Sequence, residues 1–186
     1  MIPIQNIYYM LSYAFQILNE QGYKNIATEQ FNNTAELMAA ILEKGIAIQL
    51  KRGLGKEYIP QTEALSSLRG KIDIAESIKT QSMLRKQLIC TYDEFSVNSI
   101  MNRIIKSTIE ILLRSNISKQ RKKNLRKLML YFSEVDFIDL YTVNWNVQYN
   151  RNNQTYRMLI SICYLVVKGL LQTQSDGSTK LMDFLD

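Results

Sequence analysis

Histidine is absent from this sequence of 186 residues, and its absence excludes several kinds of enzyme at once. Without an imidazole, the chain has no Ser-His or Cys-His nucleophile, no histidine general base and no histidine metal ligand. Only two cysteines occur, Cys90 and Cys163, and each lies inside an apolar run. We therefore expect buried thiols in a reducing cytoplasm and no zinc site.

Signals for nucleotide binding and for membranes are also missing. The sequence has no GxxxxGK[ST] loop, so the chain does not bind nucleotide through a P-loop. Its first residues, MIPIQNIYYML, have neither the basic region nor the small-residue cleavage site of a secretory signal. The most apolar segment, residues 158–171, is shorter than the ~20 residues that span a bilayer, and it contains Lys168. We expect a cytoplasmic protein without a membrane partner.

The acidic residues lack the spacing of a common nuclease site. Many restriction nucleases hold Mg²⁺ with an Asp and with the acid of a [DE]-x-K element, whose Lys assists attack on the phosphate. None of the 17 acidic residues is followed two positions later by Lys. The sequence therefore predicts no catalytic residue, no metal ligand and no cofactor in this chain.

One stretch, YDEFSVNSIMNRIIK at residues 92–106, nevertheless has the residue types of an active site. We interpret the adjacent Asp93 and Glu94 as acids that open the following helix, with a metal role as the alternative. Arg103 and Lys106 are expected to bind acids of the chain itself, such as Asp93. A compact Mg²⁺-dependent nuclease built on Asp93, Glu94 and Lys106 is the least favoured hypothesis.

Apolar residues at helical spacing predict a predominantly helical domain of the α+β class. Tyr8, Tyr9 and Tyr13 widen the apolar face of the first helix, and we expect them in the core more than at an interface. Residues 143–149 alternate between apolar and polar, which favours a half-buried strand, although their polar neighbours would also suit a loop. Another strand is expected at 88–95. The helices are expected over about 1–18, 34–50, 74–80, 97–115, 118–132 and 155–171.

Residues 51–73 differ in composition from the helical segments around them. This stretch contains three of the seven glycines and one of the two prolines, with short apolar pieces between them. Such a pattern is typical of strands and turns. We therefore expect a small glycine-containing β insert here. It carries five basic residues, namely Lys51, Arg52, Lys56, Arg69 and Lys71.

The excess positive charge is concentrated in one short segment. The formal net charge is +6, and residues 119–127, KQRKKNLRK, carry six positive charges and no negative one. Such a run forms either a solvated helix face or a surface for phosphates or an acidic partner. Charge alone leaves these alternatives open. A weak DNA-binding role would rest on Lys122, Lys123 and Arg126.

Five segments occur in an order and spacing that resemble the McrC family. McrC proteins are the nuclease subunits of McrBC systems, which restrict DNA that contains 5-methylcytosine. None of the five segments is catalytic by itself, but together they cover essentially the whole chain. The segments are IPIQNIYYMLSYAF, LEKGIAIQLKRGLGKEY, LRGKIDI, NRIIKST and YRMLISICYLVV.

The resemblance implies two regions, of which this sequence matches the first. An N-terminal region, here about residues 1–173, would dock on the hexameric AAA+ GTPase McrB and stimulate it. Residues 174–186 would be a linker towards a C-terminal PD-(D/E)xK nuclease domain, which agrees with the missing [DE]-x-K element. Mg²⁺ and GTP would then belong to that nuclease domain and to the partner respectively, and DNA would be contacted through the full complex.

The resemblance also implies that the β insert enters the central pore of the partner. A cation near a nucleotide site can stabilise transition-state charge directly or reposition other groups. We expect the indirect route, because one asymmetric subunit cannot reach six interfaces at once. For Arg52 and Arg69 the alternative is structural, with the guanidinium groups bound to turn carbonyls. A stand-alone basic nucleic-acid-binding module is the alternative function. The residues expected to contact and activate the partner are Arg52, Lys56, Tyr58, Arg69 and Lys71.

Overall fold

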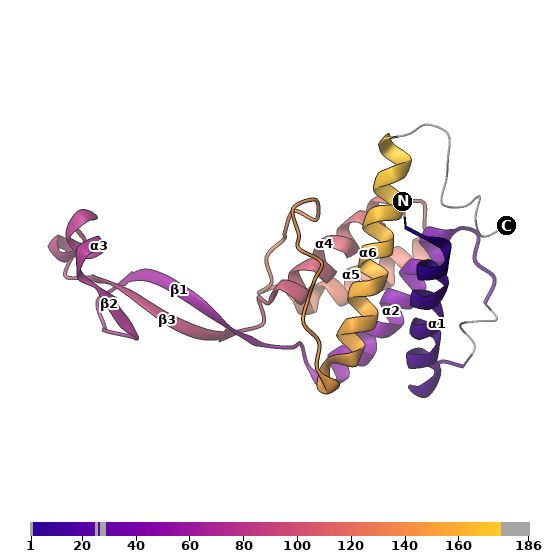
Figure 1. Cartoon of the computed structure of the whole chain (residues 1–186), viewed down its shortest axis with the longest axis horizontal. Coiled ribbons are helices and arrows are strands. Elements are labelled where there is room, and N and C mark those ends of the chain that lie inside the picture. The colour runs from indigo at the N-terminus through magenta and orange to yellow at the C-terminus, as the bar shows by residue number, and fades with distance from the viewer. Residues whose placement is uncertain (1, 25, 27–28, 176–186) are drawn as a thin grey trace. The chain divides into compact units, whose positions relative to one another are not determined.

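The computed structural model describes residues 2–24, 26 and 29–175 of the chain (Figure 1). The chain divides into two compact units at the Leu54–Gly55 and Ser99–Ile100 junctions. One unit is helical and is built from sequence on both sides of the other unit, which contains the strands. The expected α+β class with a predominance of helix is confirmed.

The helical unit is built from α-helices that share one core: α1 (Ile4–Glu20), α2 (Thr34–Arg52), α4 (Ile100–Arg114), α5 (Lys119–Met129) and α6 (Gln154–Ser175). Helix α6 packs against α1, α2 and α4, while α5 packs on α2 and α4. Met158, Leu159 and Ile162 of α6 are fully buried, so the most apolar segment of the sequence is a core helix, as expected. No helix of the described residues is both long enough and apolar enough to cross a membrane.

Helices α2 and α6 approach each other closely at Gly45. A Cβ atom at this position would lie 2.5 Å from Met158 Cε and 2.8 Å from Leu159 Cδ2. A glycine inside a helix is unfavourable by propensity alone. Here the missing side chain makes room for the core residues of α6, so α2 continues past Gly45 to Arg52.

The second unit is a three-stranded antiparallel sheet, which we call the insert, and its strands are labelled in Figure 1. Strand β1 (Glu57–Leu65) pairs along its whole length with β3 (Leu88–Ser96). Strand β2 (Lys71–Asp73) pairs with the other edge of β3. The order is therefore β1-β3-β2, with β3 in the centre.

The insert begins later and ends later than the expected span of residues 51–73. Because α2 continues through Arg52, Lys51 and Arg52 belong to the last turn of a helix rather than to the insert. The predicted short helix, α3 (Ile74–Lys79), the 3-10 helix η2 (Ser82–Arg85) and the predicted strand β3 all belong to the insert. Local patterns located α3 and β3 correctly, whereas η2 was not predicted, and such patterns carry no information about which distant strand β3 pairs with.

Residues 143–149 are extended but form no strand, so the strand expected there is wrong. Exposure does alternate along the segment, and Trp145 packs edge-on against Tyr164 with 5.3 Å between ring centroids. No strand of the described residues pairs with this segment. Its backbone forms hydrogen bonds with nearby side chains instead: the Asn146 N–H donates to Asn144 Oδ1 at 3.0 Å. The segment is therefore the polar loop that was the alternative.

Tyr8 and Tyr9 lie on the surface of α1, contrary to their expected place in the core. Their exposed fractions are 75% and 64%. Tyr13 is half-buried, and its hydroxyl donates to Gln154 Oε1 at 2.8 Å. The buried face of α1 is thus narrower than its apolar composition suggests. It consists of Ile7, Leu11, Ala14 and Leu18.

Asp93 and Glu94 lie within β3, so the expectation that they open a helix is wrong. Asp93 stands opposite Pro60 and Glu94 opposite Ile59 in the register, and both acids are exposed. Successive side chains of a strand point to opposite faces of the sheet. The two carboxylates therefore do not form one site.

Arg103 and Lys106 are bound within the chain, as expected, but to backbone carbonyls rather than to acids. Lys106 Nζ donates to the carbonyl oxygens of Phe132 at 2.9 Å and Val135 at 2.5 Å. Arg103 Nη2 donates to the carbonyl oxygen of Phe137 at 3.2 Å. These bonds fasten the segment that follows α5 to α4, and they give Lys106 a structural role.

Both cysteines are free, buried thiols, as expected from their apolar neighbours. Burial raises the pKa of the Cys163 thiol to about 12. The thiol is therefore protonated at neutral pH, and protonated thiols are poor nucleophiles.

Helix α6 continues through Ser175, so the first residues of the linker expected at 174–186 are helical instead. The rest of that expected linker, residues 176–186, lies outside the described residues.

Candidate functional site

One face of the insert carries an exposed aromatic pair with a lysine beside it. Tyr58 on β1 and Phe95 on β3 are register partners, and their ring centroids are 4.9 Å apart. Their exposed fractions are 72% and 56%. Lys56 Nζ lies 5.8 Å from the centroid of the Phe95 ring. Lys56 and Tyr58 thus belong to one cluster together with Phe95, and aromatic residues are enriched at protein interfaces.

Arg69 belongs to a different cluster, which is centred on Tyr92. Its guanidinium carbon lies 3.9 Å from the centroid of the Tyr92 ring, and the Tyr92 hydroxyl donates to a carboxylate oxygen of Glu63. This hydrogen bond raises the pKa of Tyr92. Tyr92 and Phe95 are three residues apart on β3, so they point to opposite faces of the sheet. The predicted activating residues are therefore divided between two faces.

Gly70 lies directly against the central strand and holds Arg69 and Lys71 in place. Its φ is +66°, and a Cβ atom there would meet the carbonyl oxygen of Thr91 and lie 2.7 Å from Tyr92 Cβ. The backbone of Thr91 cannot yield as a flexible side chain would, so this position requires glycine. Lys71, the next residue, pairs with Thr91 in the register and is exposed.

Arg52 is the predicted activating residue that lies outside the insert. It is the last residue of α2 and is exposed. Of the five predicted residues, the structure brings together only Lys56 and Tyr58. Phe95 was missed, because its contact with Tyr58 depends on the β1–β3 pairing and leaves no local signal.

The connection between β2 and β3 exposes apolar side chains that sequence reasoning also missed. Ile74 and Ile78 are one turn apart on α3, and Met83 and Leu84 lie in η2; all four are exposed. The sequence does contain a signal for them, because these apolar residues occur in segments predicted to be short. A short helix cannot bury apolar side chains on all of its faces. Clustered exposed apolar residues of this kind mark candidate interaction surfaces.

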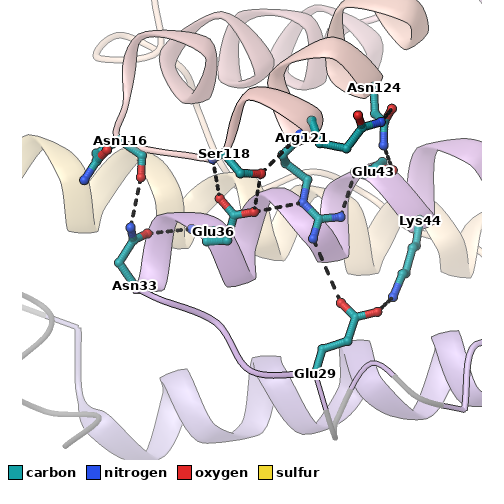
Figure 2. A network of polar contacts seen from close by, with 10 residues as sticks. Glu29, Asn33, Glu36, Glu43, Lys44, Asn116, Ser118, Arg121 and Asn124 are labelled. Carbon is teal, nitrogen blue, oxygen red and sulfur yellow. Dashed lines mark hydrogen bonds and ion pairs between the residues drawn. The ribbon is translucent and has the colours of Figure 1, made fainter.

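A polar network fastens α5 to α2 within the helical unit, as Figure 2 shows. Glu36 accepts the backbone N–H of Ser118 at 2.8 Å and its hydroxyl at 2.9 Å. Arg121 Nη1 donates to Glu43 Oε2 at 2.8 Å, and Arg121 Nε donates to Glu36 Oε1 at 3.4 Å. We call this set the α2–α5 polar network. Its members are Glu29, Asn33, Glu36, Glu43, Lys44, Asn116, Ser118, Arg121 and Asn124.

Hydrogen bonds within this network favour the charged forms of Glu36 and Arg121. Burial by itself would raise the pKa of Glu36, but the hydrogen bonds from Ser118 and Arg121 outweigh it and hold that pKa below its ordinary value. For Arg121, burial would lower the pKa, and the bonds to Glu43 and Glu36 raise it instead. The network is a set of fully paired charges, which is typical of a structural role.

The remaining basic residues of the 119–127 segment lie on the other side of α5. Arg121 and Leu125 point inward, and Leu125 is fully buried. Of the predicted DNA-binding residues, Lys123 and Arg126 are exposed and Lys122 is half-buried. Two further exposed lysines extend the set. We call the five residues the basic face of α5: Lys119, Lys122, Lys123, Arg126 and Lys127.

Carboxylates elsewhere do not converge on a metal site. Among the residues that the structure describes, no group of three or more acidic or cysteine residues could hold a metal ion. Glu134, Asp136 and Asp139, which follow one another closely in the sequence, are all exposed.

These features define a class of protein: a helical domain that carries a β insert with exposed aromatic, basic and apolar residues. Comparison with known families then identifies it. The model of the family described as McrBC 5-methylcytosine restriction system component matches residues 5–185. The chain belongs to this family, as the five sequence segments indicated.

Similar proteins are restriction systems of the same kind. The chain is 29% identical over 185 residues to the type IV methyl-directed restriction enzyme EcoKMcrBC of Escherichia coli K12, covering 98% of this chain and 53% of that protein. Its fold is similar to a chain of the Thermococcus gammatolerans McrBC complex, with 22% identity, a TM-score of 0.61, and coverage of 88% of this chain and 50% of that one.

A second similar structure is an assembly of Thermococcus gammatolerans McrB AAA+ hexamers with bound McrC. The matched chain has 22% identity and a TM-score of 0.59, and the match covers 84% of this chain and 41% of that chain. This chain thus spans about half the length of the relatives that it matches.

Proposed function

We propose that this chain is the partner-activating region of a McrC-like restriction subunit. It binds a McrB-like AAA+ GTPase hexamer, raises the rate of GTP hydrolysis and couples it to DNA cleavage. Cleavage is assigned to a nuclease region that this sequence does not include. The observation that carries the proposal is the likeness of the fold, over most of the chain, to a chain from an assembly of McrB hexamers with bound McrC.

The chemistry of the insert supports this assignment. Tyr58 and Phe95 present a large exposed aromatic surface with Lys56 beside it. Buried aromatic residues dominate the binding energy of many protein interfaces, often as a cluster surrounded by polar contacts. We assign Tyr58 and Phe95 as the anchor for the partner, and Lys56 and Lys71 as surrounding charges.

Arg69 is assigned an indirect part in the activation. Its guanidinium stacks on Tyr92, which leaves the flat group oriented rather than free to search for a phosphate. A hexamer has six nucleotide sites at its subunit interfaces, and one asymmetric subunit cannot contact all six in the same way. Activation is therefore proposed to act through the arrangement of the partner's subunits rather than through a cation delivered to every site. Arg52, in the helical unit, is proposed as a contact with the partner.

The test is GTP hydrolysis by a McrB-like hexamer with and without this chain. Stimulation should saturate as the chain is added. The Arg69→Ala, Lys71→Ala double variant should lower the maximal stimulation more than the affinity, because Arg69 is assigned to the activation and Lys71 to the charges around the anchor rather than to the anchor itself. Lys79→Ala is the matched control, because Lys79 is an exposed lysine of the same insert. Unchanged hydrolysis at saturating wild-type chain would contradict the proposal.

Thermal unfolding separates contact with the partner from a structural role. Arg69 is exposed, so the loss of its stack on Tyr92 should destabilise the insert only slightly. The double variant should therefore unfold within about 4 °C of the wild type. A much larger loss of thermal stability would assign Arg69 and Lys71 to the structure of the insert instead.

A further inference from the structure

The basic face of α5 is a charged surface that partner activation by the insert does not use. Lys119, Lys123, Arg126 and Lys127 are exposed and Lys122 is half-buried. The spacing of three and four residues places all five on one side of the helix. Over residues 119–127, a rise of 1.5 Å per residue gives a charged strip of about 12 Å.

These five cations are not paired within the part of the chain that the structure describes. The carboxylates that α5 contacts in the α2–α5 polar network are engaged by Arg121, which pairs with Glu43 and Glu36. None of the five residues of the basic face takes part in an ion pair among the described residues, whereas Arg114 on α4 is paired with Glu110. The charges of the basic face are therefore available to an external anion.

The network also fixes where an anion can bind on α5. The N-terminus of a helix attracts anions, but at α5 this position is occupied, because Glu36 accepts both the N–H and the hydroxyl of Ser118. An external anion is left with the side chains of the basic face. Because α5 is fastened to α2 by buried charges, these side chains start from a rigid support.

Side chains that could read bases are already engaged. Asn and Gln are the usual partners of adenine in the major groove, but Asn124 donates to Glu43 Oε1 at 2.8 Å and Gln120 donates to Asn124 Oδ1 at 3.0 Å. Residues 119–127 also expose no apolar side chain, because Leu125 is buried. Residues 119–127 thus offer charge alone, without the aromatic or apolar core that protein interfaces have. The exposed Leu130 and Tyr131 lie beyond the end of α5.

We propose that the basic face of α5 binds the sugar-phosphate backbone of double-stranded DNA without recognising its sequence. A strip of about 12 Å covers about three to four steps between phosphates of one strand, which are spaced 3.4 Å apart along the helix axis, and so faces about four to five phosphates. Five cations match this number of phosphates closely. This proposal is independent of the insert and of the GTPase partner.

The test is the salt dependence of DNA binding by the whole chain, measured by fluorescence anisotropy with two 20-base-pair duplexes of unrelated sequence. The affinities for the two duplexes should agree within about threefold. With four to five contacts, affinity should fall about 10²–10³-fold between 50 and 200 mM salt. The Lys122→Gln, Lys123→Gln, Arg126→Gln variant should lower the slope of log affinity against log salt by about 2 to 3 units.

A charge-matched variant serves as the control. Lys79→Gln, Arg85→Gln, Arg151→Gln has the same formal net charge of +3 (+6 minus 3) but leaves the basic face intact. It should keep the wild-type slope. Equal losses in both triple variants, or no loss in either, would overturn the proposal, because the effect would then follow net charge or another surface.

Two further arms complete the experiment. The single variant Lys123→Gln, at an exposed position where Gln and Lys have similar helix propensity, should lower the slope by about one unit. This arm keeps the proposal testable even if the triple variant fails to fold. A glutamate-rich peptide with the same net charge as the duplex should bind the chain at least tenfold more weakly than the duplex does. Equal or tighter binding of the peptide would overturn DNA as the occupant, as would a more than tenfold preference for one duplex.

Discussion

Arg121 differs from its basic neighbours in the sequence because it points toward α2. Its side chain is 17% exposed, and that of Glu36 is 11% exposed. Removing one partner of such a part-buried pair leaves the other charge without its partner and destabilises the fold. A single arginine within a run of basic residues is thus structural, while the others are free to bind an anion.

Glu36→Gln should destabilise the chain in a pH-dependent way. The pKa of Glu36 is lowered in the folded chain, so its charge stabilises the fold above its ordinary pKa of 4.5. That stabilisation is lost as the pH falls through the folded-state pKa. At pH 7 the variant should lose about 1.5–3 kcal/mol, the range for a hydrogen bond to a charged group. At pH 3 the difference should be much smaller. Urea unfolding at both pH values measures it.

Glu110→Gln is the control for this prediction. Glu110 pairs with Arg114 on the same helix, with the arginine largely exposed. Such pairs contribute about 0.3–0.5 kcal/mol, so this variant should differ little from the wild type at either pH. A loss at pH 7 equal to that of Glu36→Gln would show that burial of the network is not what matters.

At the scale of elements, the contact of β2 with β3 depends on one glycine. Gly70 touches the backbone of Thr91 and has a positive φ, while Gly53 has a positive φ with nothing within 4 Å of its Cβ position. Substitutions at these two glycines therefore distinguish the effect of backbone strain from the effect of a steric clash. Both effects apply at Gly70, and strain alone applies at Gly53.

Gly70→Ala should release β2 from the sheet and leave β1–β3 paired. Amide hydrogen exchange should then speed up at Lys71 to Asp73, while the amides of β1 keep their protection. Stimulation of the GTPase should fall as well, because Arg69 and Lys71 flank the disrupted contact. Gly53→Ala should leave the protection of β2 unchanged. If both variants lose the same protection, the collision with Thr91 is not the cause.

At the scale of the whole molecule, the insert begins and ends on paired strands. Glu57 and Ser96 are opposite in the β1–β3 register, so the outer ends of these strands, two residues inside Gly55 and three inside Ser99, lie within about 5.5 Å of each other. Segments with adjacent ends can be removed or exchanged with little effect on the remaining core. The helical unit has its own core around α6 and does not rely on the insert for it.

Replacing Gly55–Ser99 with a flexible linker of about six Gly and Ser residues should therefore leave the helical unit folded. Circular dichroism should show a cooperative unfolding transition within about 4 °C of the wild type. The variant should give no stimulation of the GTPase, yet keep the salt slope of DNA binding, since the basic face of α5 belongs to the helical unit. If the variant lost both GTPase stimulation and DNA binding, the assignment of these two functions to separate units would be contradicted.

Local sequence patterns predicted most of the secondary-structure elements. The helices, strand β3, the cap at Ser118 and the two buried thiols all follow from local patterns, because helix periodicity and capping involve residues a few positions apart. The missing [DE]-x-K element is likewise a local fact. The five sequence segments also identified the family.

Tertiary structure alone decided which surfaces these elements build. Asp93 is a strand residue because β3 pairs with β1 across the insert, and Phe95 meets Tyr58 for the same reason. Residues 143–149 have the alternation of a strand but no partner, so they form a loop. Arg121 turns inward because α2 supplies Glu36 and Glu43. Pairing and burial join residues that lie far apart in the chain, and local patterns do not record such contacts.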